Sequence, residues 1–243
     1  MTEFAGIAER IIVALDYPNA EAAERLLAEL RGIPCFMKVG MELFYAAGPR
    51  FVQRLKEEGY RVFLDLKMHD IPNTVKGGSA SITRLGVDLF NVHAAGGLAM
   101  MQAALEGAEQ ALSGTPGAKR PAIIAVTHLT STSREVLNQE IGIPGEISDA
   151  VLRYAELAKR SGLDGVVASP LEVPLVKEAC GSAFLTVTPG IRPEGAERGD
   201  QSRVMTPREA FRQGTDYIVV GRPVTAAANP REALEQIIQS LSE

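Results

Sequence analysis

Short apolar runs rich in β-branched residues alternate along this chain with longer segments of helical periodicity, and this alternation constrains the fold more than any other feature. Apolar runs separated by helix-length segments are typical of parallel βα units rather than of a β-sandwich. The predicted strands cover residues 11–15, 35–39, 61–66, 89–92, 122–126, 165–168, 184–187 and 217–220. Helices are predicted over residues 21–31, 49–58, 75–85, 98–112, 150–161, 171–179 and 207–213, with a last one over 230–241. Eight successive units predict a closed (β/α)8 TIM barrel.

A doubly wound open sheet is the alternative architecture for such a repeat. Sheets of that kind commonly carry a Gly-x-Gly-x-x-Gly phosphate turn after the first strand, and none follows residues 11–15 here. The length of 243 residues also suits an α/β barrel, which commonly occupies that length undivided. We therefore expect a single domain, residues 1–243, folded as a (β/α)8 barrel.

Charge, cysteine and histidine content narrow the possible partners. The net charge is −5 at pH 7 and the basic residues form no run, so we expect no nucleic-acid partner. The first apolar run is too short for a signal-peptide core or a membrane span, which predicts no membrane association and a cytoplasmic location. The two cysteines and three histidines show no metal-ligand spacing, so neither a disulfide framework nor a metal site is expected.

Polar side chains gather where the predicted strands end. In (β/α)8 barrels the active site lies at the carboxyl ends of the strands, so these residues would meet at one mouth. Taken singly, Asp16 is a typical turn or capping residue and Lys38 a typical surface cation. The polar residues at or just beyond the strand ends are Asp16, Lys38, Asp65, Lys67, Asn91, His93, Thr127, Thr130 and Thr188. Their convergence predicts an active site.

The third strand ends in the most informative stretch, where Asp65, Lys67 and Asp70 fall within six positions. Because strand side chains alternate between faces, Asp65 and Lys67 share one, and Asp70 follows in a loop. An isolated pair of this kind is most often a structural ion pair. At a barrel mouth, a carboxylate–ammonium–carboxylate cluster would keep Lys67 protonated, able to stabilise a developing carbanion and then to protonate it.

The last two predicted strands are followed by segments suited to an anion. Gly221 lets backbone N–H groups approach a phosphate, and the guanidinium of Arg222 can bind phosphate oxygens at two points. A long Gly-rich loop after the seventh strand contributes Arg192 and Gln201, and its length suits a lid. Taken singly, the Gly-Arg pair is an ordinary tight turn and the loop a solvated connector. Together they predict a phosphorylated small molecule as ligand.

Six motifs of the chain match one known family. They are Val13-Ala14-Leu15-Asp16, Lys38-Val39-Gly40, Asp65-Leu66-Lys67-Met68-His69-Asp70-Ile71-Pro72-Asn73-Thr74, Thr127-His128-Leu129-Thr130-Ser131, Thr188-Pro189-Gly190-Ile191-Arg192 and Val219-Val220-Gly221-Arg222-Pro223. With these motifs the chain resembles the orotidine 5'-phosphate decarboxylases of the bacterial type, from Ile11 to Arg222. The resemblance implies decarboxylation of orotidine 5'-monophosphate to uridine 5'-monophosphate in pyrimidine synthesis, without metal or organic cofactor.

The resemblance also implies roles for single residues. By analogy, Asp16 and Lys38 would contact ribose hydroxyls, and Lys67 would protonate C6 of the pyrimidine within a charge array completed by Asp65 and Asp70. Asp70 and Thr74 would reach into the active site of the neighbouring subunit of a homodimer, so that each site is built from two chains. Thr130 would read the pyrimidine amide edge, with Pro189 packing nearby. The residues that would close on the phosphate are Arg192, Gln201, Gly221 and Arg222. For the loop residues Arg192 and Gln201, direct phosphate binding and latching of the lid both remain open.

Two other functions remain open at this stage. A Mg²⁺-dependent sugar-phosphate decarboxylase or synthase of the same barrel group would share the Asp-x-Lys-x-x-Asp motif, but it would place a metal-binding Glu where this chain has Lys38, and a cation there opposes Mg²⁺. A non-catalytic sensor of nucleotide phosphates would not need Lys67 and both aspartates. The sequence does not settle the roles of His69 and His93, and it favours core hydrogen-bonding histidines over catalytic groups.

Overall fold

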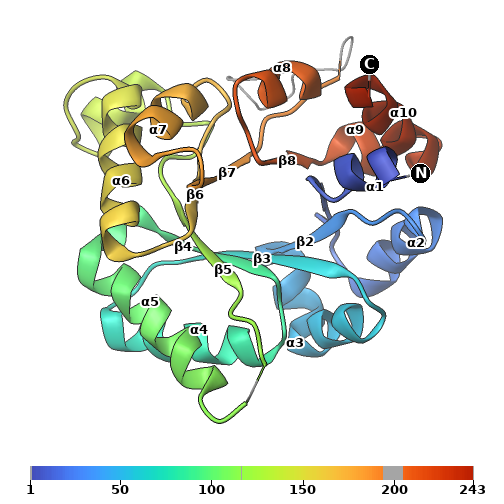
Figure 1. Ribbon diagram of the computed structural model, residues 1–243, viewed down its shortest axis with the longest axis horizontal. Coiled ribbons are helices and arrows are strands. Elements are labelled where there is room, and N and C mark those ends of the chain that lie inside the picture. The colour runs from blue at the N-terminus through green and yellow to red at the C-terminus, as the bar shows by residue number, and fades with distance from the viewer. Residues whose placement is uncertain (1, 116, 194–204, 243) are drawn as a thin grey trace.

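Parallel strands close into a barrel in the computed structural model, which describes residues 2–115, 117–193 and 205–242 (Figure 1). Each strand pairs with the next one along the chain, and β8 pairs with β1 to complete the ring. The strands are β1 (Ile11–Ala14), β2 (Phe36–Gly40), β3 (Arg61–Met68), β4 (Leu89–His93), β5 (Ala122–Val126), β6 (Gly165–Val167), β7 (Leu185–Thr188) and β8 (Tyr217–Val220). The predicted single-domain (β/α)8 barrel is confirmed.

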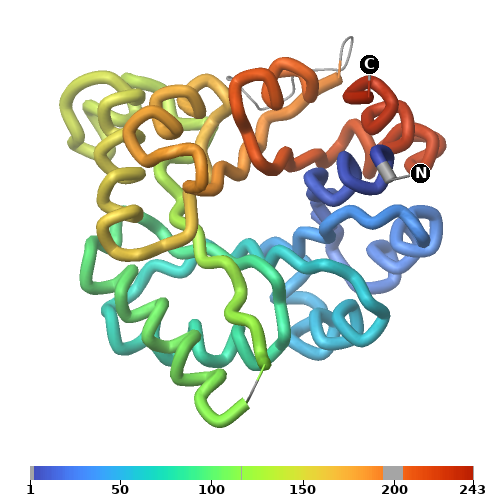
Figure 2. Tube along the Cα trace, viewed as in Figure 1, coloured from blue at the N-terminus to red at the C-terminus, as the bar shows by residue number. Residues whose placement is uncertain are grey.

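Helices surround the barrel on its outer face (Figure 1). They are α1 (Thr2–Ala8), α2 (Ala20–Leu30), α3 (Met41–Glu57), α4 (Pro72–Arg84), α5 (Gly97–Leu112), α6 (Ile147–Ser161), α7 (Val173–Cys180), α8 (Pro207–Arg212), α9 (Arg222–Thr225) and α10 (Pro230–Ser242). A 3₁₀ turn, η1 (Ala94–Gly96), precedes α5, and a π-helical turn, η2 (Val136–Glu140), lies between β5 and α6. Helices α1 and α10 contact each other and bring the two ends of the chain together (Figure 2).

The predicted boundaries differ from the observed ones mainly at α3. The sequence predicts a helix from residue 49, whereas α3 begins at Met41 and is kinked at Gly48, which has a φ of 70° just before Pro49. Proline disfavours a helical conformation in the residue before it, so the Gly-Pro pair falsely suggests a helix start. Helices α1 and α9 lie outside the predicted set. Other ends shift by a few residues, as for β7, which begins at Leu185 rather than at 184.

Two apolar layers hold the barrel together. The inward-facing side chains fill its interior, and they include Ile12, Phe36, Phe63, Ile124 and Val219. Their neighbours along each strand face outward and pack against the helices in a much larger core, as the alternation of strand side chains requires. A filled interior leaves the two ends of the barrel as the places where polar side chains can gather.

Three aspartates tie the amino-terminal ends of the strands together. Each follows a glycine of positive φ by two residues and directly precedes β4, β6 or β8. The carboxylate of Asp88 accepts hydrogen bonds from the backbone N–H of Val62 at 2.7 Å and from the side chain of Lys56. Asp164 does the same with Ile123, at 2.7 Å, and Arg120. Asp216 does so with Thr186, at 2.7 Å, and Lys177. A carboxylate so placed bridges a strand to the preceding one, and we call these contacts the Gly-x-Asp clamps.

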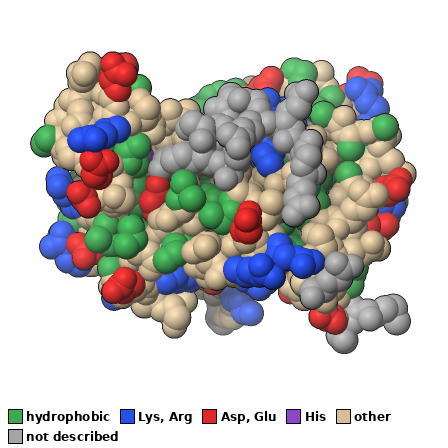
Figure 3. Space-filling view, turned by 90° about the horizontal axis from the view of Figure 1, so that it is seen from above, with side chains coloured by type: hydrophobic (Ala, Val, Ile, Leu, Met, Phe, Trp, Pro, Cys, Tyr) green, Lys and Arg blue, Asp and Glu red, His purple; other side chains and the backbone are tan. Residues whose placement is uncertain are grey.

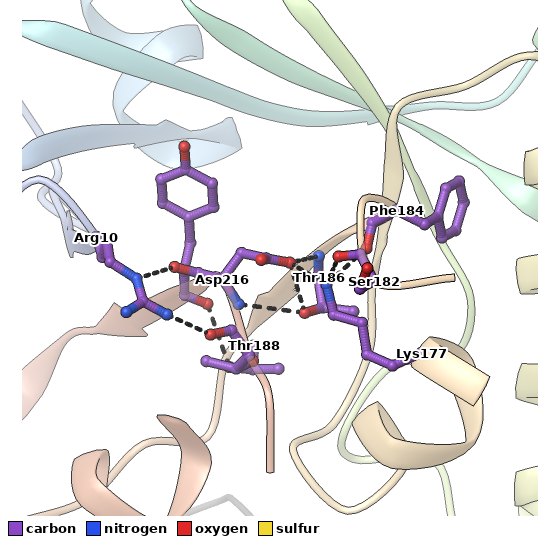
Figure 4. Close-up of polar contacts among 9 residues, drawn as sticks. Arg10, Lys177, Ser182, Phe184, Thr186, Thr188 and Asp216 are labelled. Carbon is purple, nitrogen blue, oxygen red and sulfur yellow. Dashed lines mark hydrogen bonds and ion pairs between the residues drawn. The ribbon is translucent and has the colours of Figure 1, made fainter. Parts of the chain in front are cut away.

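Figure 4 shows the clamp at Asp216. Its Oδ2 accepts hydrogen bonds from Lys177 Nζ at 2.6 Å and from Thr186 Oγ1 at 3.0 Å. Arg10 donates to the backbone carbonyls of Asp216 and Thr215, at 3.1 and 2.8 Å, and so ties the start of β1 to the start of β8. Polar groups at this end of the barrel stabilise the closed ring, and they lie opposite the end at which such barrels carry their active sites.

The described surface carries mixed charge. On the face in Figure 3, acidic and basic side chains are interspersed with apolar and neutral ones. Within the described residues, none of the helices combines the length and the apolar character needed to cross a bilayer.

Candidate active site

A cavity of about 250 Å³ opens at the carboxyl ends of the strands. Its wall combines side chains of the barrel interior with charged and polar groups from the strand ends. The lining residues are Lys38, Phe63, Asp65, Lys67, Val126, His128, Leu129, Thr130, Ser131, Val167, Val187, Pro189 and Val219. Five of the predicted site residues, namely Lys38, Asp65, Lys67, Thr130 and Pro189, therefore come together here.

Four charged side chains of alternating sign form a chain of contacts at this mouth. Lys38 Nζ lies 3.0 Å from Asp16 Oδ1 and 3.4 Å from Asp65 Oδ2. Lys67 Nζ donates to the other oxygen of Asp65, Oδ1, at 2.8 Å. The carboxylate of Asp65 thus bridges two ammonium groups, and the order Asp16–Lys38–Asp65–Lys67 balances the formal charge of the four groups.

Burial makes the central pair of this chain electrostatically strong. The side chains of Lys38 and Asp65 are only 10% and 11% exposed. Burial raises the pKa of Asp65, but Lys38, Lys67 and the hydrogen bonds from Lys67 and Asn91 outweigh it, so the pKa lies below its ordinary value. Burial likewise lowers the pKa of Lys38, but Asp65 and Asp16 outweigh it and hold the pKa above its ordinary value. Both groups are therefore ionised at neutral pH.

A glycine leaves room for the outer pair. A Cβ atom at Gly40 would come within 3.2 Å of both Asp16 Oδ1 and Lys38 Nζ, closer than nearly all Cβ contacts. The loop that holds Asp16 is tied to the eighth unit, because the hydroxyl of Tyr17 donates to the carbonyl of Thr225 at 3.2 Å. The side chain of Asp16 remains 60% exposed, so it can meet a ligand at the rim of the mouth.

The backbone of β3 is irregular where it presents Lys67. Regular pairing with β4 is interrupted between Leu64 and Met68, and Lys67 has a φ of 52°. Among the described residues, it is the one non-glycine residue of positive φ, a conformation that costs about 1–2 kcal/mol for an L-residue. The predicted Asp65–Lys67 pair is formed, but within a β-bulge rather than in a regular strand.

Asp70 and Thr74 do not join this cluster within their own chain. Both are exposed, and Asp70 Oδ1 accepts the backbone N–H of Ile71 at 2.6 Å. Among the described residues, no hydrogen bond or ion pair connects Asp70 with Lys67. The predicted carboxylate–ammonium–carboxylate cluster is therefore incomplete within one chain. Asp65 is flanked by Lys38 and Lys67 instead, and Asp16 contacts Lys38 from its other side.

The predicted phosphate ligands lie on two segments beyond the cavity wall. Gly221 directly precedes α9, and Arg222 is the first residue of that helix and is exposed. Arg192 donates from its guanidinium to the carbonyl of Ile191 at 2.9 Å. Gln201 lies outside the described residues.

All three histidines of the chain lie close to Lys67. His69 and His93 stack with their ring centroids 5.5 Å apart, and His128 lines the cavity. Burial, aided by His69, His128 and Lys67, lowers the pKa of His93 below 6.5. The interpretation as core hydrogen-bonding histidines is wrong for His69, which is exposed. For His93, the buried Nδ1 atom has no hydrogen-bond partner among the described residues, so the interpretation is also wrong for that atom.

Two strand-end threonines face away from the mouth. Thr127 Oγ1 donates to the carbonyl of Val167 at 2.9 Å, and Thr188 Oγ1 lies 2.8 Å from Thr215 Oγ1. Neither lines the cavity, because the side chains that precede and follow them along the strand point inward instead.

The ligand set at the mouth does not resemble a Mg²⁺ site. Within the described ranges, no three side chains of the metal-binding types His, Cys, Asp and Glu group together. Asp16 and Asp65 approach one another, but Lys38 Nζ lies between them and contacts both. An ammonium group in that place excludes a divalent cation by charge.

Asn91 is a strand-end residue to which the sequence assigns no role. Its side chain is fully buried and bonds both Asp65 and the backbone of Lys67. Its position at the end of β4 marks it as a mouth residue, but the bulge that it faces has no signal in the sequence.

Comparisons with known proteins agree with this geometry. Residues 9–237 match the family described as "Orotidine 5'-phosphate decarboxylase / HUMPS family". Orotidine 5'-phosphate decarboxylase of Bacillus cereus (strain AH820) is 52% identical over 233 residues, which cover 96% of this chain and 97% of that protein. The enzyme of the same name from Moorella thermoacetica is 54% identical over 231 residues, with 94% and 90% covered. The crystal structure of orotidine 5'-phosphate decarboxylase from Lactobacillus acidophilus aligns with a TM-score of 0.84 at 45% identity, covering 96% of this chain and 99% of that one. The chain belongs to the orotidine 5'-phosphate decarboxylase / HUMPS family.

Proposed function

We propose that this chain decarboxylates orotidine 5'-monophosphate to uridine 5'-monophosphate, with Lys67 as the group that protonates the product carbon. The observation that carries the proposal is the ammonium of Lys67, held on the wall of the mouth cavity by Asp65 at 2.8 Å. Membership of the decarboxylase family and relatives at more than half identity support it.

The chemistry requires a fixed cation beside one carbon atom. When the bond from C6 to the carboxylate breaks, carbon dioxide leaves and the electron pair stays on C6 as a carbanion that the ring delocalises poorly. An ammonium group oriented in advance stabilises that charge at little cost in reorganisation. Lys67 then transfers a proton from Nζ to C6 and is reprotonated from solvent.

The remaining charges suit the binding of a ribonucleotide. Lys38 and Asp16 lie side by side next to Asp65 and offer a donor and an acceptor to the ribose hydroxyls. Thr130 and Pro189 on the cavity wall would border the pyrimidine. Gly221 and Arg222 would bind the phosphate together with Arg192 and Gln201. Phosphate binding far from C6 supplies energy that can organise the reacting end.

One assay separates this function from the two alternatives. The purified chain is treated with EDTA, given orotidine 5'-monophosphate, and followed by the ultraviolet absorbance of the pyrimidine. We expect full turnover without added metal. Turnover that appears only with Mg²⁺ would favour the sugar-phosphate decarboxylase group, and tight binding without turnover would favour a sensor.

We further propose that the chain works as a homodimer in which Asp70 and Thr74 complete the partner's site. Both residues are exposed at the start of α4, and neither bonds its own Lys67. Large exposed apolar side chains accompany them at the mouth ends of the neighbouring units: Ile71 is 67% exposed and Tyr45 is 74% exposed. Contiguous apolar patches mark protein interfaces, and in the proposed dimer these two side chains would contribute to such a patch.

Subunit mixing tests the shared site. Lys67→Ala and Asp70→Ala chains, each nearly inactive alone, are unfolded together in equal amounts and refolded. Random pairing makes about half the dimers mixed, and one of the two sites in each mixed dimer then has wild-type composition. Activity should recover to roughly a quarter of the wild-type value. Activity that stays at the average of the two parents would place Asp70 in the site of its own chain.

A cytoplasmic location is also proposed. Cys35 and Cys180 are both free thiols in the barrel and its helices, as is usual for proteins of a reducing compartment.

A further inference from the structure

The bulge in β3 lies opposite one residue of β4. Leu64 pairs with Phe90, and Met68 pairs with Val92, so the three residues 65–67 stand opposite Asn91 alone. A bulge disrupts the backbone ladder and leaves groups without their usual partners. The side chain of Asn91 can therefore supply the bulged residues of β3 with hydrogen-bond partners that the backbone of β4 does not provide.

Asn91 makes two hydrogen bonds there, one with each half of its amide. Its Oδ1 accepts the backbone N–H of Lys67 at 2.8 Å. Its Nδ2 donates to Asp65 Oδ1 at 2.7 Å, the same oxygen that accepts the hydrogen bond from Lys67 Nζ. Asn91 is 1% exposed, so water does not replace these partners if they are removed.

The two bonds act on the two ends of one catalytic unit. The first satisfies a backbone N–H in the left-handed conformation of Lys67, which an L-residue otherwise avoids. The second fixes the carboxylate against which the Lys67 ammonium is held. We propose that Asn91 is a positioning residue that fixes both the backbone of Lys67 and the carboxylate of Asp65, and so aims the Lys67 ammonium into the mouth cavity.

Only an amide meets both requirements without adding charge. Aspartate at position 91 keeps the acceptor for the N–H of Lys67 but places a second carboxylate against Asp65. Leucine has a similar volume and offers neither bond. The pair Asn91→Asp and Asn91→Leu therefore separates the two contacts.

The test rests on the proposed decarboxylation and measures two quantities. In both variants, kcat for orotidine 5'-monophosphate should fall at least about tenfold, or about 1.4 kcal/mol in activation free energy, while KM stays within about threefold of the wild-type value. Hydrogen exchange of the Lys67 amide, followed by mass spectrometry, should become fast in Asn91→Leu and stay slow in Asn91→Asp. A residue that only stabilised the fold would lower the melting temperature and leave kcat unchanged.

Thr186→Val is the matched control. It removes a hydrogen bond to Asp216 from an equally buried strand residue at the opposite end of the barrel, and it should leave kcat unchanged. Three outcomes would each overturn the positioning role. They are a wild-type kcat in folded Asn91 variants, a parallel loss of kcat and substrate binding, and unchanged amide exchange in Asn91→Leu. If Asn91→Leu does not fold, the near-isosteric Asn91→Asp decides by kcat. A wild-type chain without turnover would refute the proposed function instead, and the exchange experiment would still test the backbone contact.

Discussion

Replacing Asp65 by asparagine should weaken the fold strongly, because the carboxylate lies buried between two lysines. The change keeps the shape of the side chain and removes its charge. It leaves Lys38, whose side chain is 10% exposed, with Asp16 as its remaining carboxylate, and it takes from Lys67 the oxygen to which it donates at 2.8 Å.

The size of the effect follows from burial. Removing one partner of a buried ion pair costs about 3–5 kcal/mol. Lys38 keeps its contact with Asp16 at 3.0 Å, and the side chain of Lys67 is 28% exposed and partly solvated, so the low end of this range applies. We expect a loss of about 3 kcal/mol in the free energy of unfolding. In a chain of this length that corresponds to about 6–12 °C in melting temperature.

Urea unfolding at pH 7, followed by far-ultraviolet circular dichroism, measures the loss. Asp16→Asn is the matched control, since Asp16 contacts the same Lys38 but its side chain is 60% exposed. An exposed pair contributes about 0–1 kcal/mol, so Asp16→Asn should be several times milder. Equal effects of the two variants, or an Asp65→Asn chain as stable as the wild type, would refute the burial argument.

The buried Asp65–Lys38 pair also predicts how the free energy of unfolding changes with pH. Because Lys38 and Lys67 outweigh burial and hold the pKa of Asp65 below its ordinary value of 3.8, the ionised carboxylate stabilises the fold above that pH. This contribution disappears as the pH falls through the lowered pKa. The difference in unfolding free energy between the wild type and Asp65→Asn should therefore be constant from pH 5 to 8 and shrink below about pH 4.

Three further changes test other parts of the molecule. Asp164→Ala breaks a Gly-x-Asp clamp and leaves the N–H of Ile123 without its partner. The free energy of unfolding in urea should therefore fall by about 1–3 kcal/mol, while kcat stays unchanged. A large loss of kcat would contradict a purely structural role. Burial holds the pKa of His93 below 6.5, so the unfolded chain takes up the proton first and the wild type loses stability as the pH falls below 6.5. Between pH 7 and 5, His93→Phe should lose less unfolding free energy than the wild type in the same assay. Equal losses of unfolding free energy would argue against a neutral His93. Arg222→Ala should reduce kcat/KM at least about tenfold, since a charged hydrogen bond contributes about 1.5–3 kcal/mol, and an unchanged value would move the phosphate site elsewhere.

The predictable part of this molecule is the part that periodicity and strand position determine. Alternating βα units predict the closed barrel, and the rule that strand ends meet at one mouth correctly brings Lys38, Asp65 and Lys67 together. The contact between Lys38 and Asp65 follows from neighbouring strands, because β2 and β3 pair in parallel register. Residue type alone does not predict a lysine with a 10% exposed side chain between two carboxylates, because a lone lysine is usually a surface cation.

The bulge is the part that the sequence hides. A positive φ is normally adopted by glycine or asparagine, but here the residue of positive φ is Lys67. The extra residues of β3 opposite Asn91 depend on the register with β4, which arises only when the barrel closes.

The Gly-x-Asp clamps, in contrast, are visible as a repeat in the sequence. Gly86, Gly162 and Gly214 each stand two residues before an aspartate that precedes an apolar run, and this repeat at alternate strands would have predicted a shared structural role.

The proposed function depends on a Lys67 ammonium that both stabilises and protonates C6. Its most direct test is the turnover of orotidine 5'-monophosphate by Lys67→Ala, with Lys76→Ala as the control, because Lys76 forms an exposed ion pair with Glu106 on the outer helices. We predict that Lys67→Ala keeps a folded barrel by circular dichroism and loses nearly all turnover, while Lys76→Ala retains the wild-type kcat. A folded Lys67→Ala chain that turns over at close to the wild-type rate would show that Lys67 is not the proton donor.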